Sequence, residues 1–201
     1  MTASTAPLPS DTSSARRPPS APALLSALSF AALTIAYVVL NSATPQPTAT
    51  GAEVLAYDRQ NGIAVRVGAF LLLASAVPLA LLTATLPGRL RALGKAASAS
   101  AVGPVGGVLA TAALILSALF TWTGARLPAD AEPALARTVA DLSFLTGGVA
   151  YAVSFGLFVG GLTVAAGLRN GLLPKPLAVV GIAVAAAGLL ATLSLLAAPI
   201  G

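Results

Sequence analysis

Three carboxylates beside one apolar run are the first candidates for chemistry in this chain. Asp130, Glu132 and Asp141 precede the apolar segment at 142–168. Divalent cations prefer carboxylate oxygens as ligands, so these groups could form a cation or proton site at a membrane surface. The competing interpretation, which we favour, makes them rim charges and helix caps, with Asp130 as the N-cap and Glu132 and Pro133 in the first turn.

A second candidate is the polar pair Tyr151 and Ser154, which lies inside the same apolar run. Residues three apart share one helix face, so this pair predicts contacts to a small ligand in a membrane cavity. Hydroxyl groups in membrane helices also bond to their own helix or to a neighbour, and that role is the alternative. Arg137 and Asp141 are four residues apart and are expected to pair across one helical turn.

The residue types that are missing exclude much of enzyme chemistry. The chain has no Cys and no His, which removes thiol nucleophiles, zinc fingers, imidazole ligands to haem and most acid–base schemes at neutral pH. The sequence also has no Walker loop, dinucleotide fingerprint or HExxH motif. No apolar run holds a charged residue at its centre, where proton relays and ion pathways usually need one. We therefore assign no catalytic, cofactor-binding or metal-binding residue, and expect a protein that is not an enzyme.

The composition places the chain in a bilayer. Hydrophobic residues make up 57% of the 201 residues and charged residues 8%, too few to cover a soluble globule with polar surface. We predict an all-α, polytopic transmembrane helix bundle with spans at 23–40, 63–86, 102–123, 142–168 and 177–198. Residues 1–22 are expected to form a disordered cytoplasmic tail. A cleaved signal peptide is the alternative for the first span, although its apolar run is longer than the core of such peptides.

A ladder of small residues marks the fourth span as the centre of the bundle. Gly148, Ala152, Gly156 and Gly160 follow one another at intervals of four. In a regular α-helix this spacing puts them on one face, where a second backbone can come close. The other spans are therefore expected to pack around the fourth.

Three local signals shape the first half of the chain. Thr50 and Glu53 have the spacing of a capping box and predict a short helix over 53–60 near the membrane surface. Pro78 predicts a kink in the second span. After Pro87 the chain is expected to turn.

Basic residues in the loops predict the orientation, because they are in excess on the cytoplasmic side. With the N-terminus inside, the cytoplasmic segments carry seven of the 11 basic residues, which are Arg16, Arg17, Arg89, Arg91, Lys95, Arg169 and Lys175. Arg59, Arg66, Arg126 and Arg137 then lie outside. We therefore predict a bacterial cytoplasmic membrane protein with its N-terminus in the cytoplasm and its C-terminus outside. These residues flank apolar runs and do not form a patch with aromatics, so no nucleic-acid partner is expected.

Four segments carry a resemblance to a known family. They are TGAEVLAYDRQNG before the second span, GRLRALG after it, DAEPALARTVADLSFL entering the fourth, and GLRNGLLPKPLAVVGI entering the fifth. They resemble a family of small multi-pass membrane proteins from high-GC bacteria, known as a domain of unknown function. The resemblance covers roughly 50–193, rests on the E-V-L-x-Y helix and the L-R-x-G-x-L-P turn, and departs at Asp58 and Gln60-Asn61. It implies the same fold and orientation, and it carries no activity.

These observations support three hypotheses for the function. The first is a non-enzymatic membrane protein that acts through helix packing with itself, a membrane partner or lipid. The second is a transporter or binding protein for a small molecule or lipid, with a cavity near Tyr151. The third is an outward-facing enzyme that uses Asp130, Glu132 and Asp141. We favour the first, because buried charge and catalytic residues are missing from the spans.

Overall fold

Every regular element is helical in the part of the chain that the structure, a computed structural model, describes, which is 21–92, 101–128, 130–168 and 173–197. Five helical stretches are long and apolar enough to cross a membrane: Ala21–Leu40, Gly62–Gly88, Val102–Gly124, Pro133–Gly167 and Lys175–Leu196. The predicted all-α bundle is therefore confirmed. The predicted tail lies outside the described residues except for its last two positions.

The elements follow the chain in a simple order. The first three membrane-length helices are α1 (Ala21–Leu40), α3 (Gly62–Ala92) and α4 (Val102–Gly124), and the short α2 (Gly51–Gln60) lies between α1 and α3. The fourth is composite and consists of α5 (Pro133–Phe144), the π-helical η2 (Leu145–Ala150), α6 (Tyr151–Thr163) and the π-helical η3 (Val164–Leu168). The fifth begins with α7 (Lys175–Leu190) and ends with the 3-10 turn η4 (Ala191–Leu193) and α8 (Ser194–Ala197).

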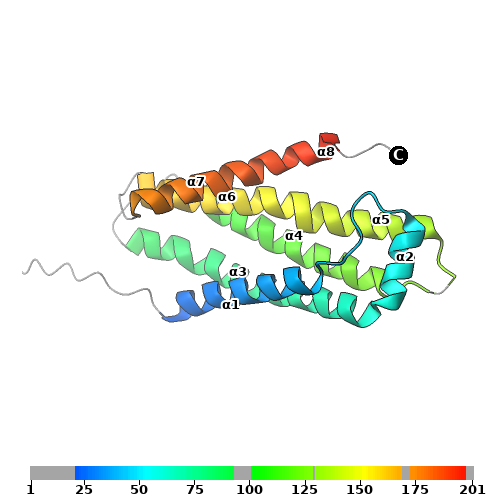
Figure 1. Ribbon diagram of the computed structural model, residues 1–201. Helices are drawn as coiled ribbons and strands as arrows, with labels where there is room; N and C mark the ends of the chain where they lie inside the picture. Colours follow the sequence, from blue (N-terminus) through cyan, green and yellow to red (C-terminus); the bar gives the residue numbers. More distant parts are fainter. Residues whose placement is uncertain (1–20, 93–100, 129, 169–172, 198–201) are drawn as a thin grey trace, which may run out of the picture.

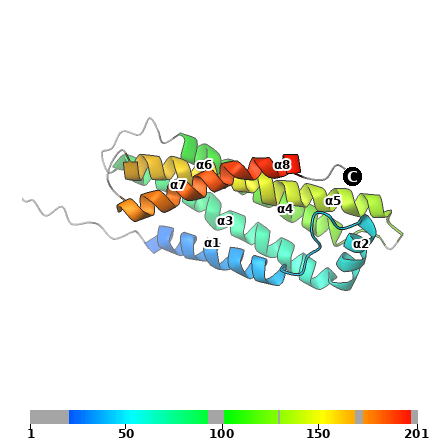
Figure 2. The same cartoon turned by 45° about the horizontal axis from the view of Figure 1, so that its top comes forward.

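The long helices run up and down the bundle, and α2 lies across one end of it (Figures 1 and 2). Helix α3 packs against α1 and α4, α4 packs against α6, and α6 packs against α7. Helix α1 begins at the far end, whereas α8 runs toward the end that carries α2, which we call the α2 end. The described chain therefore starts and finishes on opposite sides of the bundle.

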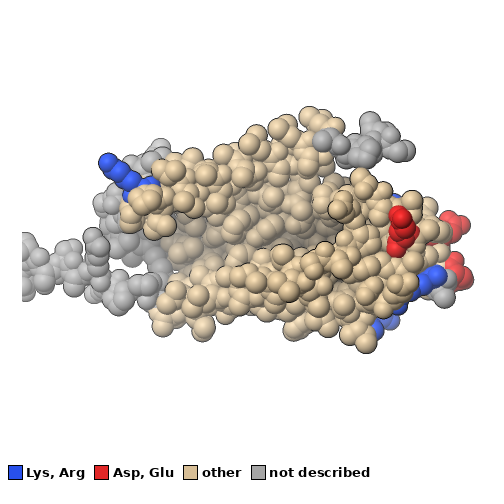
Figure 3. Space-filling model, in the orientation of Figure 1, with Lys and Arg blue, Asp and Glu red and all other residues tan. Residues whose placement is uncertain are grey.

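Charged side chains occupy the two ends of the face drawn in Figure 3, and the surface between them is uncharged. All the acidic side chains visible there lie at the α2 end, while basic side chains also lie at the far end, where α7 begins. Between the ends, large apolar side chains are exposed, such as Phe70 and Leu196, which are 65% and 85% exposed. An apolar belt bounded by charged ends is the surface of a membrane protein.

The tightest packing lies between α3, α4 and α6. Leu79 of α3 and Ala110 of α4 are fully buried, and Phe158 of α6 joins them in the same cluster. Glycine brings α4 against α6, because a Cβ on Gly106 would stand 2.5 Å from the backbone N of Phe158 and 2.7 Å from the carbonyl O of Ser154. Such backbone approach is how helices associate in lipid, where apolar burial provides no drive.

The small-residue ladder of the fourth span lies partly against α7. A Cβ on Gly156 would stand 3.1 Å from the carbonyl O of Ala185 and 3.2 Å from the Cα of Gly188. A Cβ on Gly160 would stand 2.9 Å from the Cβ of Ala185, and one on Gly188 would overlap the carbonyl O of Ala152. Three of the four ladder residues therefore line one close helix–helix contact.

Gly148 does not share that contact. The nearest atoms to a Cβ on Gly148 belong to the ring of Phe144 in its own helix, 3.6 Å away. The reason is η2, where the Tyr151 N–H reaches back five residues to the carbonyl O of Thr146. A spacing of four keeps residues on one face only in an uninterrupted α-helix, so the π-turn separates Gly148 from the other three.

Two predicted boundaries are wrong. The chain does not turn after Pro87, since α3 continues through Pro78 and Pro87 to Ala92, because neighbouring groups can compensate for a proline in a membrane helix. Asp130 is not an N-cap. The N-cap of α5 is Glu132, with no side-chain cap bond, and Pro133 follows at the first helical position, where its fixed φ starts the helix.

Candidate ligand-binding cavity

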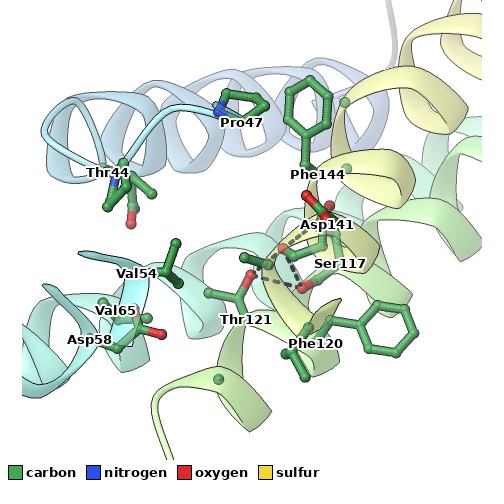
Figure 4. A pocket seen from close by; sticks show the side chains of 18 of the residues that line it. Thr44, Pro47, Val54, Asp58, Val65, Ser117, Phe120, Thr121, Asp141 and Phe144 are labelled. Atoms are coloured by element: carbon green, nitrogen blue, oxygen red, sulfur yellow. Dashed lines mark hydrogen bonds between the residues drawn. The ribbon is translucent and has the colours of Figure 1, made fainter. Parts of the chain in front are cut away.

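A cavity of about 290 Å³ opens at the α2 end of the bundle (Figure 4). It lies between the end of α1, the following loop, α2, α3, α4 and the α5–η2 segment. We call it the α2-end cavity. Its walls include Tyr37, Asn41, Thr44, Pro47, Val54, Asp58, Val65, Leu72, Ser117, Phe120, Thr121, Arg137, Ala140, Asp141, Ser143 and Phe144.

The predicted capping box is present and fixes the start of α2. The backbone N–H of Thr50 donates to the Glu53 carboxylate at 2.7 Å, and the Glu53 N–H donates to Thr50 Oγ1 at 3.3 Å. The backbone hydrogen bond from Thr50 lowers the pKa of Glu53. Val54 and Leu55 are each 6% exposed and pack against Ala136 of α5. Helix α2 is therefore docked on the bundle by its apolar face.

The same face of α2 carries Asp58, one turn beyond Val54. Its carboxylate is half-buried and lines the cavity, and it makes no hydrogen bond or ion pair with any described residue. Gly124 of α4 lies close by, because a Cβ there would stand 3.3 Å from Asp58 Oδ2. Desolvation by burial raises the pKa of Asp58 from 3.8 to about 6. An unpaired carboxylate with a raised pKa in a cavity is a mark of a functional site.

Arg137 of α5 fastens the loop over the cavity. Its guanidinium pairs with Asp141 through Nη2 at 2.5 Å and Nε at 3.1 Å, which confirms the predicted pair. The same guanidinium donates from Nη1 to the carbonyl O of Ala49 at 2.7 Å and from Nη2 to the carbonyl O of Pro47. The planar fork of arginine suits several simultaneous bonds of this kind, so Arg137 joins α5 to the α1–α2 loop.

A cluster of three hydroxyls joins α4 to α5 at the cavity wall (Figure 4). Ser117 Oγ donates to the carbonyl O of Ser143 at 3.0 Å, and Thr121 Oγ1 lies 2.7 Å from Ser143 Oγ. Thr121 also donates to the carbonyl O of Ser117 at 2.8 Å. Gly147 in η2 makes room for this cluster, because a Cβ there would overlap Ser117 Oγ.

The structure brings one of the predicted carboxylates into the cavity. Asp141 lines it, whereas Asp130 and Glu132 are exposed residues outside its lining. Tyr151 and Ser154 do not line it either. The ring of Tyr151 stacks on Phe155 with centroids 5.4 Å apart.

Asp58 is the cavity group that sequence reasoning missed. The prediction for this segment was a short helix near the membrane surface, with no role for Asp58. A usable signal exists, since Asp58 lies four residues after Val54 and three after Leu55, positions that share a helix face. A carboxylate on the same face as two apolar residues indicates a half-buried acid once that face is known to pack against the bundle.

Some basic residues of the predicted topology have side chains that the structure does not describe. They are Arg89, Arg91 and Lys95, which form the basic cluster, and Arg169.

No protein-family model matches the chain, and no curated protein or solved structure matches it either. The resemblance to a family of small bacterial membrane proteins therefore stays a prediction.

Proposed function

We propose that this membrane protein binds a small molecule in the α2-end cavity, either to sense it or as the first step of transporting it. One observation carries the proposal: a cavity of about 290 Å³ holds the half-buried carboxylate of Asp58, which has no partner among the described residues. Its volume is close to the lower end of the range for ligand pockets, and a few polar groups in a largely apolar wall are typical of them. The predicted binding function is thus kept, and its site moves from Tyr151 to Asp58.

Helix packing as the function has less support. The ladder residues Ala152, Gly156 and Gly160 already contact α7 of the same chain, so they are not free to bind a second protein. Assembly with a membrane partner or a second copy stays a prediction with no surface assigned to it.

The orientation forms part of the proposal. The excess of basic residues in the other loops favours an α2 end that faces outside the cytoplasmic membrane. The chain has no cysteine, so a single introduced cysteine is the only thiol that can be labelled, and its labelling shows which side of the membrane it faces. We expect Ala52→Cys and Ala131→Cys to react with a membrane-impermeant maleimide in intact cells, and Lys175→Cys to react only after permeabilisation. The reverse pattern would refute the orientation and leave the cavity untouched.

Native mass spectrometry of the gently extracted protein tests the binding function. We expect a copurifying small molecule on the unaltered chain. Ala140→Phe puts a ring into the cavity wall and should remove that molecule. The matched control is Ala134→Phe, on an exposed position of the same helix, which should retain it. An adduct that survives Ala140→Phe, or no adduct on the unaltered chain, would contradict the proposal.

A further inference from the structure

We infer that the α2-end cavity selects a small organic ammonium ion with N–H donors and an apolar body, held by the carboxylate of Asp58. This inference rests on the proposed binding function and adds the chemical class of the ligand. Three properties of the cavity carry it: its charge, its hydrogen-bonding groups and its aromatic walls.

The charge of the cavity lining is negative. Among the described residues that line it, the titratable side chains are Tyr37, Asp58, Arg137 and Asp141. Arg137 and Asp141 neutralise each other, and the remaining bonds of the guanidinium go to the carbonyl oxygens of the loop. One unbalanced carboxylate therefore remains, on Asp58. A buried charge without a partner is costly, so a cation beside Asp58 relieves that cost and an anion increases it.

Several hydrogen-bonding groups of the cavity present acceptors to a ligand. Ser117 and Thr121 direct their hydroxyl hydrogens to backbone carbonyls, and Asn41 Nδ2 donates to the carbonyl O of Tyr37. Oxygen lone pairs on these side chains and on Asp58 are left for a ligand. A protonated primary amine has three N–H donors and no acceptor, so it complements this set better than a neutral alcohol or a carboxylate.

The remaining walls are apolar and aromatic. Phe120 and Phe144 line the cavity together with Tyr37, Val65 and Leu72. Aromatic rings attract cations through their negative faces and also accept an apolar body. The walls therefore favour an ammonium ion with a hydrocarbon group over a hydrated metal cation.

Four probes of one shape test the inference by isothermal titration calorimetry on the purified full chain in detergent. They are cyclohexylamine, cyclohexanol, cyclohexanecarboxylate and N,N,N-trimethylcyclohexylammonium. We expect cyclohexylamine to bind at least about tenfold more tightly than the other three, a difference of roughly 1.4 kcal/mol. Asp58→Asn should remove this preference, and Asp130→Asn, which changes the charge of an exposed residue at the same end of the bundle, should keep it. Folding of each variant is checked by circular dichroism.

The outcomes separate the ligand class from the binding function. Binding of cyclohexanol or cyclohexanecarboxylate as tight as that of the amine, or amine binding that survives in Asp58→Asn, would overturn the cationic ligand but leave the cavity as a binding site. Equal binding of the trimethylammonium probe would overturn the requirement for N–H donors. Failure of all four probes to bind overturns the inference, and the proposed function also fails if the extracted protein carries no adduct.

Discussion

Gly188 of α7 lies against Gly156 of α6 so closely that a Cβ on Gly188 would stand 2.9 Å from the Cα of Gly156. The opposing atoms are backbone, including the carbonyl O of Ala152, so they cannot rotate out of the way as a side chain can. This contact joins α7 to the rest of the bundle, because α6 is the main neighbour of α7.

Gly188→Ala should therefore weaken the docking of α7. We expect a loss of about 1–3 kcal/mol, the usual cost of overpacking a close contact, measured as a lower melting temperature in detergent. Gly148→Ala is the matched control, because its Cβ would make only an ordinary contact with the Phe144 ring at 3.6 Å. Equal melting temperatures for the two variants would contradict a close α6–α7 contact.

The pH dependence of stability should report Asp58. Burial raises its pKa from 3.8 to about 6, so between these values the folded state binds more protons than the unfolded state. Stability must then fall as the pH rises through this window. We expect Asp58→Asn to be more stable than the unaltered chain above about pH 6 and to lose this slope. Asp130→Asn should retain the slope. If Asp58→Asn also retained it, the slope would not come from Asp58, and the carboxylate of Asp58 in the unaltered chain would be well solvated.

Arg137 should control the order of the loop at the cavity. Arg137→Lys keeps the positive charge but loses the fork that reaches both Ala49 and Pro47. We expect amide exchange over residues 42–49 to become about tenfold faster, which corresponds to roughly 1.4 kcal/mol of local opening. Asp141→Asn leaves both loop bonds in place and should have a smaller effect. If Asp141→Asn loosens the loop as much as Arg137→Lys does, the ion pair and not the carbonyl bonds orders the loop.

Ser117 and Gly147 should behave as a coupled pair. A Cβ on Gly147 would overlap Ser117 Oγ and stand 2.9 Å from Ser117 Cβ, so Gly147→Ala alone is expected to cost about 1–3 kcal/mol. In the Ser117→Gly background the obstructing side chain is gone. The double variant should then be more stable than the sum of the two single changes predicts, by at least about 0.5 kcal/mol. Additive melting data would contradict direct contact between α4 and η2.

Features set by neighbouring residues could be predicted from the sequence. The capping box of Thr50 and Glu53 and the pair of Arg137 and Asp141 each lie within one helical turn, so the spacing alone specifies them. The five membrane-length helices follow from apolar runs, which the bilayer selects by length.

Features that depend on long-range packing could not be predicted in this way. Asp58 and Gly124 are far apart in the sequence, and only the docking of α2 brings them together at the cavity. The π-helical η2 has no sequence signature that we could use, and it separates Gly148 from the ladder. Asp130 was the better cap by residue type, but Pro133 decided where α5 begins.

The π-helical turn between α5 and α6 also acts as a rotational offset in one continuous helix. Each residue turns an α-helix by about 100°, so η2 sets the angle between the half that faces the cavity and the half that packs against α7. A one-residue deletion that restored α-helical winding there would remove the extra residue and the wider turn together, so both halves would keep their present faces. The two halves can therefore vary independently by substitution, whereas a one-residue deletion within the regular winding of α5 or α6 would turn one half by about 100° relative to the other.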